Sequence, residues 1–355
     1  MCGIYGTSIN YSESQVISKL KQTSFRGPDQ MGFKSIKTKD SNLSFGHNRL
    51  SIIDLDPRSN QPLNYQNTIH IVFNGEIFNF QSIKESLIKK GYTFNTTSDT
   101  EVICAAYLEY GEDCVNQFNG MFAFVIYDAS TNKLFGARDR LGQKPFYYYH
   151  KGKDFEFSSQ ISSIQLHHSN LTISKNSIES YLLWGYIPDT KSIFNEVATL
   201  AAGHSFSFDL QSGNLEIKKY WDIDYKGKKQ FKGNYNDAVN ELEELLTNAT
   251  KLRLFADVPV GIFLSGGVDS SLVASLAAKN SSEKVKTFSV KFDNKKLDES
   301  EYAKNVAKHL NTEHTTIECD YKEGLSLIDN FSYFCWSKLS NFYNFSIFYK
   351  NRLMI

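Results

Sequence analysis

A short apolar run that leads directly into a glycine-rich turn constrains the fold of this chain more than any other stretch. VPVGIFL (258–264) has the length and composition of a strand buried in a parallel sheet. SGGVDSSLVASLAAKN then turns and enters a helix, and VKTFSVKF (285–292) and EHTTIE (313–318) are again typical of strands on either side of a helical segment at 299–310. With the amphipathic helix expected at 237–254, this alternation predicts a doubly wound parallel α/β sheet.

The first half of the chain has a different pattern. GMFAFVIYD (120–128) and NKLFGARD (132–139) predict two strands, and residues 145–159 predict a hairpin around KGKD. Helical periodicity covers residues 80–91 and 98–111, and the second segment begins with a Ser-x-x-Glu capping box from Ser98 to Glu101. Strands with few helices between them predict a layered α+β domain.

Composition excludes several classes of function. The chain has 39 basic and 39 acidic residues among 355, so its formal net charge is zero and it lacks the excess positive charge of nucleic-acid or anionic-membrane binding. No long apolar run and no signal peptide is present, so we expect a cytoplasmic protein without a membrane partner. The five cysteines are scattered without a CxxC pair, which argues against a structural zinc site or a disulfide framework.

The SGGVDSS segment (265–271) has the chemistry of an anion-binding loop. Gly266 and Gly267 allow the backbone to approach an anion closely, and the following helix N-terminus adds a favourable dipole and free N–H donors. The alternative is a plain Gly-Gly turn with Asp269 in the first helical turn. The apolar strand before the loop favours the anion site, because α/β sheets bind ligands at the carboxyl ends of their strands.

Further motifs precede this loop in a fixed order. They are MCGIYG (1–6), RGPDQMG (26–32), GHNRLSIID (46–54), FNGEIFN (73–79) and SDTEV (98–102). The series resembles the glutaminase domain of class II, N-terminal-nucleophile amidotransferases, and SGGVDSS resembles the pyrophosphate loop of ATP pyrophosphatase-type synthetases. The whole chain is thereby similar to the glutamine-hydrolysing asparagine synthetases.

This resemblance implies a domain plan. It implies an α/β/β/α N-terminal-nucleophile sandwich at 2–210, a linker at 211–235, and the first part of an ATP pyrophosphatase domain at 236–330. Residues 331–355 form an aromatic-rich tail without clear periodicity. Family members continue well beyond this length, so we expect a domain cut short by a frameshift or premature stop. The alternative is a genuine hydrophobic plug that covers a sheet edge.

Cys2 is the expected nucleophile. After removal of Met1 it would carry both a thiol and an α-amine, whose ordinary pKa of about 8 lets it act as the base for its own side chain. An acyl-transfer centre also needs an oxyanion hole, and the resemblance assigns it to the Asn74 side-chain amide and the Gly75 N–H. The alternatives are a frayed terminus for Cys2 and an ordinary hairpin turn for Asn74–Gly75.

The resemblance also implies a set of glutamine-binding residues. Arg49 suits bidentate recognition of the α-carboxylate, and Asp99 and Glu76 match the ammonium-binding positions, although Asp99 is equally explained as a charge in the first turn of a helix. The RGPD segment (26–29) is expected to border this pocket, preceded by Phe25 where the family usually has histidine. The complete set is Arg49, Leu50, Ser51, Ile52, Ile53, Asn74, Gly75, Glu76 and Asp99.

For ATP as co-substrate, the resemblance implies residues around the glycine-rich loop and on the next strand. Asp269 is also the candidate carboxylate for Mg²⁺, and Asp298 and Glu299 lie in a further family segment near the nucleotide. No tightly bound organic cofactor is implied. The nucleotide-binding set is Leu264, Ser265, Gly266, Gly267, Asp269, Ser270 and Val290.

The predicted activity is amidation of aspartate through β-aspartyl-AMP, with ammonia released from glutamine at Cys2. Glutamine, aspartate and ATP are the expected partners, and the family implies a homodimer. Two alternatives remain open, a bare glutaminase and a non-catalytic remnant that binds nucleotide or a full-length partner. A synthetase for another carboxylate, such as the β-lactam-forming relatives, is disfavoured by Cys2, because those relatives lack a working N-terminal cysteine.

Overall fold

The computed structural model describes residues 1–39, 41–188, 190–225, 231–296 and 298–319. The chain divides into two compact units, the first running from Met1 to Ile223 and the second beginning at Asp224. The predicted tail at 331–355 and the end of the predicted synthetase segment lie outside the described residues.

The first unit contains two six-stranded antiparallel sheets. One sheet has the order β10-β8-β9-β1-β3-β2 and the other the order β12-β11-β7-β6-β5-β4. The strands of the first sheet are β1 (Gly3–Thr7), β2 (Gln30–Lys37), β3 (Asn42–Arg49), β8 (Tyr147–Lys151), β9 (Asp154–Ser158) and β10 (Val197–Thr199). Those of the second are β4 (Leu63–Tyr65), β5 (Ile69–Ile77), β6 (Gly120–Asp128), β7 (Lys133–Arg138), β11 (His204–Asp209) and β12 (Leu215–Lys219).

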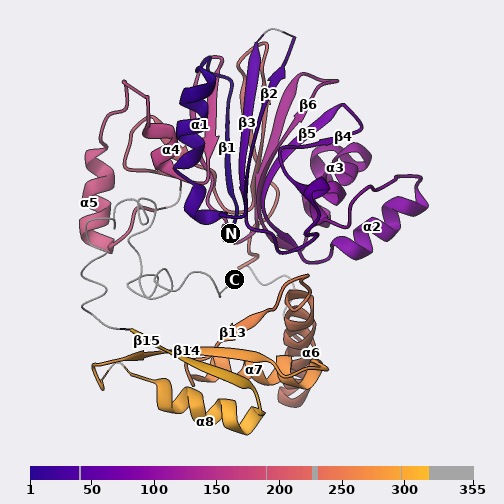
Figure 1. Cartoon of the computed structure of the whole chain (residues 1–355), viewed down its shortest axis with the longest axis vertical. Coiled ribbons are helices and arrows are strands. Elements are labelled where there is room, and N and C mark those ends of the chain that lie inside the picture. Colours follow the sequence, from indigo (N-terminus) through magenta and orange to yellow (C-terminus); the bar gives the residue numbers. More distant parts are fainter. Residues whose placement is uncertain (40, 189, 226–230, 297, 320–355) are drawn as a thin grey trace. The chain divides into compact units, whose positions relative to one another are not determined.

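Helices lie outside both sheets, which gives four layers (Figure 1). On the first sheet lie α1 (Glu13–Lys21) and α4 (Ile161–Gln165), and on the second α2 (Phe80–Lys89) and α3 (Asp99–Tyr110). The unit also contains α5 (Lys175–Trp184) and three short 3₁₀ turns, η1 (Ser24–Arg26), η2 (Pro57–Ser59) and η3 (Gly111–Gln117). The predicted α/β/β/α sandwich is confirmed.

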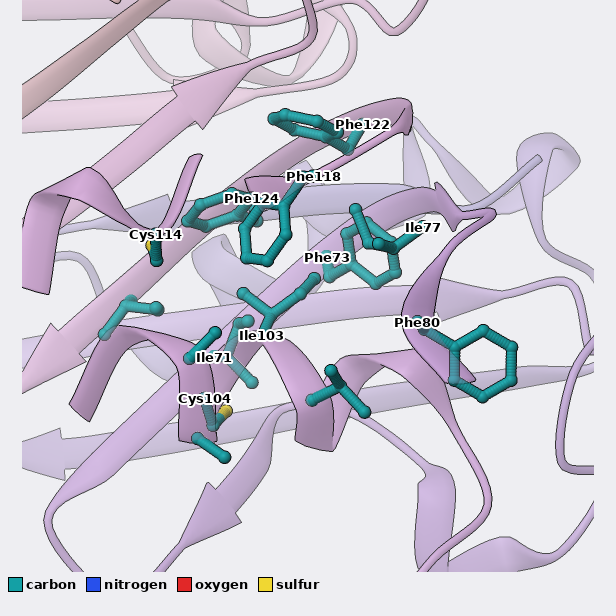
Figure 2. Close-up of a cluster of buried hydrophobic side chains, with 14 of the residues drawn as sticks. Ile71, Phe73, Ile77, Phe80, Ile103, Cys104, Cys114, Phe118, Phe122 and Phe124 are labelled. Atoms are coloured by element: carbon teal, nitrogen blue, oxygen red, sulfur yellow. The ribbon is translucent and has the colours of Figure 1, made fainter. Parts of the chain in front are cut away.

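Strand alternation distributes the apolar side chains between two cores. Val72 of β5 packs with Ile4, Phe45 and Val125 in the core between the two sheets. Its neighbours on either side, Ile71 and Phe73, point the other way and pack against α2 and α3, since successive strand residues face opposite sides. Figure 2 shows this outer core, where Cys104 and Cys114 are buried among Ile103, Phe118 and Phe124. These two cysteines are packing residues of this core.

The second unit begins with a long helix and continues with a small parallel sheet. α6 (Tyr235–Arg253) starts at a capping box between Asn234 and Asp237. The sheet has the order β13-β14-β15, with strands β13 (Gly261–Phe263), β14 (Lys286–Phe292) and β15 (Glu313–Cys319). α7 (Val268–Asn280) and α8 (Ser300–Leu310) connect these parallel strands (Figure 1). The predicted parallel α/β pattern is confirmed. A doubly wound sheet reverses its strand order at one point, and the three strands within residues 231–319 contain no such reversal.

Two local predictions were wrong. Ser98 is the N-cap residue of α3, but its side chain makes no capping bond, and Glu101 instead accepts from the Asn95 and Thr96 backbone N–H groups. The nearby Thr96 hydroxyl contacts both Ser98 and Glu101, and this local network replaces the capping box. The strand Leu215–Lys219 also falls inside the segment predicted as a linker at 211–235, because its residues pair with β11 in the second sheet.

A buried ion pair joins the helical layer to the first sheet. Lys19 of α1 lies 3.0 Å from Glu156 of β9, and both side chains are fully buried. The Lys19 ammonium also donates to the carbonyls of Ser163 and Ile164 at 3.1 Å, and the Tyr5 hydroxyl donates to Glu156 at 2.7 Å. These bonds fix α1 and α4 against the strand that follows Cys2.

We predict that Lys19→Met lowers the free energy of unfolding by about 3–5 kcal/mol, because it leaves the Glu156 carboxylate buried without its cation. Urea unfolding of the purified chain measures the change. The matched control is Lys218→Met, which removes an exposed pair with Glu112 and is expected to cost less than about 1 kcal/mol. Equal losses in the two variants would contradict the assigned role of the buried pair.

Candidate active site

Cys2 is held in place by strand pairing rather than left at a frayed terminus. Gly3, the next residue, pairs with Asn48, and β1 lies between β3 and β9 in the middle of the first sheet. The Cys2 thiol accepts from the Leu50 N–H at 3.4 Å and lies 3.6 Å from the Leu50 carbonyl oxygen. The pKa of the Cys2 thiol is raised above its ordinary value because the group is buried.

The RGPD segment supports Cys2 and the end of β3. Arg26 donates from Nε to the Cys2 carbonyl at 3.0 Å. Asp29 accepts from the Ser51 N–H at 2.8 Å and donates its own N–H to the Arg49 carbonyl at 3.0 Å. A Cβ atom on Gly27 would come within 2.2 Å of the Asn48 carbonyl oxygen, so only glycine allows this close approach. The segment thus fixes residues 49–51 beside the thiol.

Asn74 and Gly75 lie inside β5, and the alternative that they form a hairpin turn is wrong. Asn74 pairs with Ala123 and Gly75 with Phe122 of β6. The Asn74 side chain is fully buried, and neither its nitrogen nor its oxygen has a hydrogen-bond partner among the described residues. A Cβ atom on Gly75 would lie 2.1 Å from the Met121 carbonyl oxygen, so strand β6 excludes any larger residue there.

The strand period directs Asn74 toward the sheet that carries Cys2. Val72 packs in the core between the sheets, and Asn74 and Glu76 follow it at intervals of two on the same face of β5. The two sheets also meet here directly, because the His47 ring contacts the Phe73 carbonyl at 3.0 Å. His47 pairs with Ile4 of β1, which places the Cys2 end of β1 close to the Asn74 end of β5.

Arg49 is the last residue of β3, and its side chain binds the loop that follows this strand. Its terminal nitrogens donate to the carbonyls of Ile53, Asp54 and Asp56 and to the Asn60 side chain. These bonds hold in place the loop that carries the predicted glutamine-binding residues Leu50, Ser51, Ile52 and Ile53. Leu50 also contacts the Cys2 thiol. The Arg49 charge also acts on the buried Asp99 carboxyl. The guanidinium binds its own loop in this structure, and its carboxylate-binding role stays a prediction.

Two buried carboxyl groups lie next to each other at the start of α3 and the end of β5. Asp99 accepts from the Ile77 N–H at 2.9 Å. Burial raises the pKa of Asp99 to about 7. Burial and the neighbouring Asp99 raise the pKa of Glu76 well above its ordinary value, and one Glu76 oxygen has no described hydrogen-bond partner. The ammonium group of a ligand would supply a positive charge beside these two carboxyl groups. Asp99 is thus a buried carboxyl in the first turn of α3, and its ammonium-binding role stays a prediction.

Lys144 is a charged group of this site that the sequence did not reveal. It follows β7 and is only 4% exposed. Its ammonium makes no hydrogen bond or ion pair within the described parts of the chain, yet its charge acts on Cys2, Glu76 and the chain-terminal amine. The lysine within GQKPFYYY was the available signal, but the pattern alone does not show that this side chain is buried.

The structure brings most of the nucleotide-binding set together in one loop. Leu264 is buried and donates to the Phe288 carbonyl at 2.7 Å, which ties the end of β13 to β14. The Ser265 and Ser270 hydroxyls lie 3.0 Å apart across the loop. Val290 lies two residues beyond Phe288, at the same edge, because the carboxyl ends of parallel strands share an edge.

Gly266 and Gly267 give this loop its shape. Gly266 has φ +84°, and a Cβ atom there would meet Tyr302 at 2.5 Å. Gly267 is the N-cap of α7 without a side-chain cap, so the first N–H groups of this helix remain available to an anion. Asp269 is exposed in the first turn, and Asp298 accepts from the Ser300 N–H at 3.1 Å at the start of α8.

Neither a metal cluster nor a membrane span is found in the described parts of the chain. No group of three or more His, Cys, Asp and Glu side chains there is arranged to hold a metal ion. No described helix combines the length and apolar character needed to cross a membrane.

Comparison with known proteins identifies both units. The family described as "Glutamine amidotransferase domain" matches residues 1–221, and the family described as "Asparagine synthase" matches residues 241–343. A protein assigned as glutamine-hydrolysing asparagine synthetase 2 of Methanocaldococcus jannaschii is 36% identical over 360 residues, which cover 94% of this chain and 68% of that protein. The glutamine-hydrolysing asparagine synthetase 1 of Bacillus subtilis is 34% identical over 322 residues, which cover 88% of this chain and 49% of that protein.

Among solved structures, the glutamine phosphoribosylpyrophosphate amidotransferase of B. subtilis, complexed with ADP and GMP, has a TM-score of 0.47 at 13% identity, covering 89% of this chain and 65% of that one. The present chain thus spans 68% of the archaeal relative and about half of the bacterial one. With a glutamine amidotransferase domain over most of its length and these two relatives, the chain belongs to the family of glutamine-hydrolysing asparagine synthetases.

Proposed function

We propose that this chain hydrolyses glutamine at Cys2 and uses the ammonia, with ATP, to convert aspartate to asparagine through β-aspartyl-AMP. The observation that best supports the first step is the Asn74 amide. It is fully buried, has no described partner, and faces the sheet that carries Cys2. An unpaired buried amide is costly to folding, and an oxyanion that forms only during reaction would satisfy it.

The proposed reaction begins with the Cys2 thiol, after Met1 has been removed. The α-amine of Cys2 accepts the thiol proton while sulfur attacks the side-chain carbonyl carbon of glutamine. The resulting oxyanion is held by Asn74 Nδ2 and the Gly75 N–H. The C–N bond then breaks as the amine returns the proton to the leaving nitrogen, which leaves as ammonia. Water hydrolyses the γ-glutamyl thioester to glutamate and restores the thiol.

In the same proposal, the α-ammonium of glutamine binds between Asp99 and Glu76. Arg49 and the backbone of Leu50, Ser51, Ile52 and Ile53 hold the α-carboxylate, which requires the guanidinium to exchange part of its loop contacts for the ligand. A carboxylate is the stronger acceptor for a guanidinium.

The second unit would bind ATP at the loop before α7. The free N–H groups at the start of α7, with Ser265 and Ser270, suit the phosphates, and Leu264 and Val290 would border the adenine and ribose. Asp269 would supply one carboxylate to Mg²⁺, whose other ligands would be phosphate oxygens and water. The proposal also includes a homodimer and a cytoplasmic location, both taken from the family.

We predict that Cys2→Ala abolishes glutamate release from glutamine, because no other described thiol lies at the site. Cys319→Ala, which removes a half-buried thiol of β15, should leave the rate unchanged. The assay is glutamate formation, combined with mass spectrometry of the intact protein to confirm loss of Met1. Glutaminase activity in the Cys2→Ala variant would contradict the assignment of the nucleophile.

For the oxyanion hole, we predict that Asn74→Ala lowers kcat of glutamine hydrolysis by about 10²–10³-fold with little change in KM, because the lost bond forms only in the transition state. Asn64→Ala, at an exposed position of β4, is the matched control. A purely structural Asn74 would instead change unfolding while leaving kcat intact.

A pH dependence follows from Asp99. Its carboxyl holds a proton below about pH 7, and the ligand ammonium requires the ionised form, so glutamine binding releases a proton. We predict that KM for glutamine is about tenfold higher at about pH 6 than at about pH 8. Asp99→Asn should raise KM and remove this slope, whereas Asp113→Asn, on the exposed η3 turn, should preserve it. A KM independent of pH in the wild-type chain would contradict the ammonium site.

The raised pKa of Asp99 also determines how the stability of the fold changes with pH. The folded state holds the Asp99 proton more tightly than the unfolded chain, so stability is lost as pH rises from about pH 4 through about pH 7. Asp99→Asn should therefore raise the free energy of unfolding at about pH 8 by at least about 1 kcal/mol.

The synthetase step has a separate test. With ATP, Mg²⁺, aspartate and free ammonia, the proposal expects AMP, pyrophosphate and asparagine in equal amounts. Glutamate release without these products would support the alternative that the chain acts only as a glutaminase. Absence of glutamate release in every condition would leave a non-catalytic chain.

A further inference from the structure

One side of β5 has no strand partner at the height of Gly75. β6 pairs with β5 along its whole length, from Ile69 to Ile77. On the other side β4 pairs only with the stretch from Ile69 to Ile71, and β5 and β4 are the last two strands of this sheet among the described residues. Backbone groups of residues 72–77 that point to this open side must therefore bind side chains or remain available to a ligand.

Two side chains hold the backbone groups of Phe73 on the open side of β5. The Phe73 N–H donates to the side-chain oxygen of Gln61 at 2.6 Å, and the Phe73 carbonyl oxygen lies 3.0 Å from Nε2 of His47. Backbone groups along a strand alternate between its two sides with a period of two residues. The Gly75 N–H therefore points to the same open side as the Phe73 N–H.

The residue opposite Gly75 supports this direction. Phe122 pairs with Gly75, but its N–H donates to the Asp139 carboxylate at 3.2 Å and its carbonyl accepts from the Asp139 N–H at 2.8 Å. Both backbone groups of Phe122 thus point away from β5. Two residues beyond Gly75, the Ile77 N–H donates to Asp99 at 2.9 Å. The Gly75 N–H therefore lies between two N–H groups that side chains already hold.

Gln61 is itself fixed by contacts with three elements. Its side chain is buried, and while the oxygen accepts from Phe73, the nitrogen donates to the Thr100 hydroxyl of α3 at 3.3 Å. A Cβ atom on Gly32 of β2 would lie 1.9 Å from the Gln61 carbonyl oxygen, so the Gln61 backbone lies directly against the first sheet. Gln61 thus connects β2 and α3 to the open side of β5.

We propose that Gln61 is a positioning residue for glutamine hydrolysis, which holds the Phe73 N–H and thereby directs the Gly75 N–H at the oxyanion. This inference rests on the proposed oxyanion hole of Asn74 and Gly75. A backbone N–H has no rotamers, so only the position of its strand can direct it, and an oxyanion donor must lie within about 3 Å of the oxygen. Gln61 contacts no reacting atom in this assignment.

The alternative is that Gln61 only satisfies a buried N–H where β4 has ended. The test therefore compares glutamine hydrolysis with the alkylation of Cys2 by iodoacetamide, which is a displacement at a saturated carbon and needs no oxyanion hole. Gln61→Met removes both side-chain hydrogen bonds with little change in size. We expect kcat to fall about tenfold with KM nearly unchanged, because the Gly75 N–H is displaced and not lost. The rate of Cys2 alkylation should not change.

Two further variants serve as controls. Gln61→Glu keeps an oxygen that accepts from the Phe73 N–H and should retain a higher kcat than Gln61→Met. Gln66→Met, in the exposed turn between β4 and β5, should leave both hydrolysis and alkylation unchanged. Urea unfolding shows whether each variant folds, and Gln61→Leu takes the place of Gln61→Met if that variant does not fold.

Equal kcat values for the wild-type chain and folded Gln61→Met would overturn this inference and leave the proposed function intact. So would a parallel loss of hydrolysis and alkylation, because that result describes a residue that supports the whole site and not the oxyanion donor. A wild-type chain that releases no glutamate would instead overturn the proposed function, and this inference with it.

Discussion

The pairing of β1 with β3 and β9 is the interaction on which the rest of the site depends. β1 has only five residues, and all of them are buried. Its ladder to β3 runs without a gap from Gly3 to Thr7, so the residue before it cannot fray. Strand pairing therefore converts a chain terminus into a fixed position, with the thiol against Leu50 and the carbonyl against Arg26. Every proposed contact of the nucleophile follows from that placement.

Around this terminus the fold retains groups that a structure optimised for stability alone would have paired. Asn74 has an unsatisfied buried amide, Glu76 and Asp99 are neighbouring buried carboxyls, and Lys144 is only 4% exposed and has no described ion pair. Each destabilises the empty protein, and a glutamine molecule offers complementary groups to three of them. Elsewhere the same unit pairs its buried charges, as Lys19 and Glu156 show. This contrast distinguishes the candidate site from the rest of the unit, because residues that serve an activity commonly reduce the stability of the fold.

Regular elements were predictable because periodicity and glycine boundaries define them locally. The strand at 120–128 was predicted with the bounds of β6, and the alternation after residue 258 predicted the parallel α/β pattern but not the order of its strands. The errors arose where contacts made in the folded structure override a local sequence preference. Ser98 lost its capping role to a network around Thr96, and Asn74–Gly75, a strong turn signal, lies inside a strand because β6 pairs along its full length. Lys144 was missed because only the folded loop around Asp139 buries it. The hydrogen bonds between Arg49 and its own loop were also missed, because such contacts are not visible in the sequence.

The central claim is that the terminal cysteine forms a covalent bond to the glutamyl group of glutamine. The most direct measurement is rapid acid quenching of the chain during glutamine turnover, followed by proteolysis and mass spectrometry of every cysteine-containing peptide. The account predicts one γ-glutamyl group on the peptide that begins with Cys2 and has lost Met1, and none on the peptides that contain Cys104, Cys114 or Cys319. A glutamyl adduct on any other cysteine, or glutamate release from a chain that retains Met1, would contradict it.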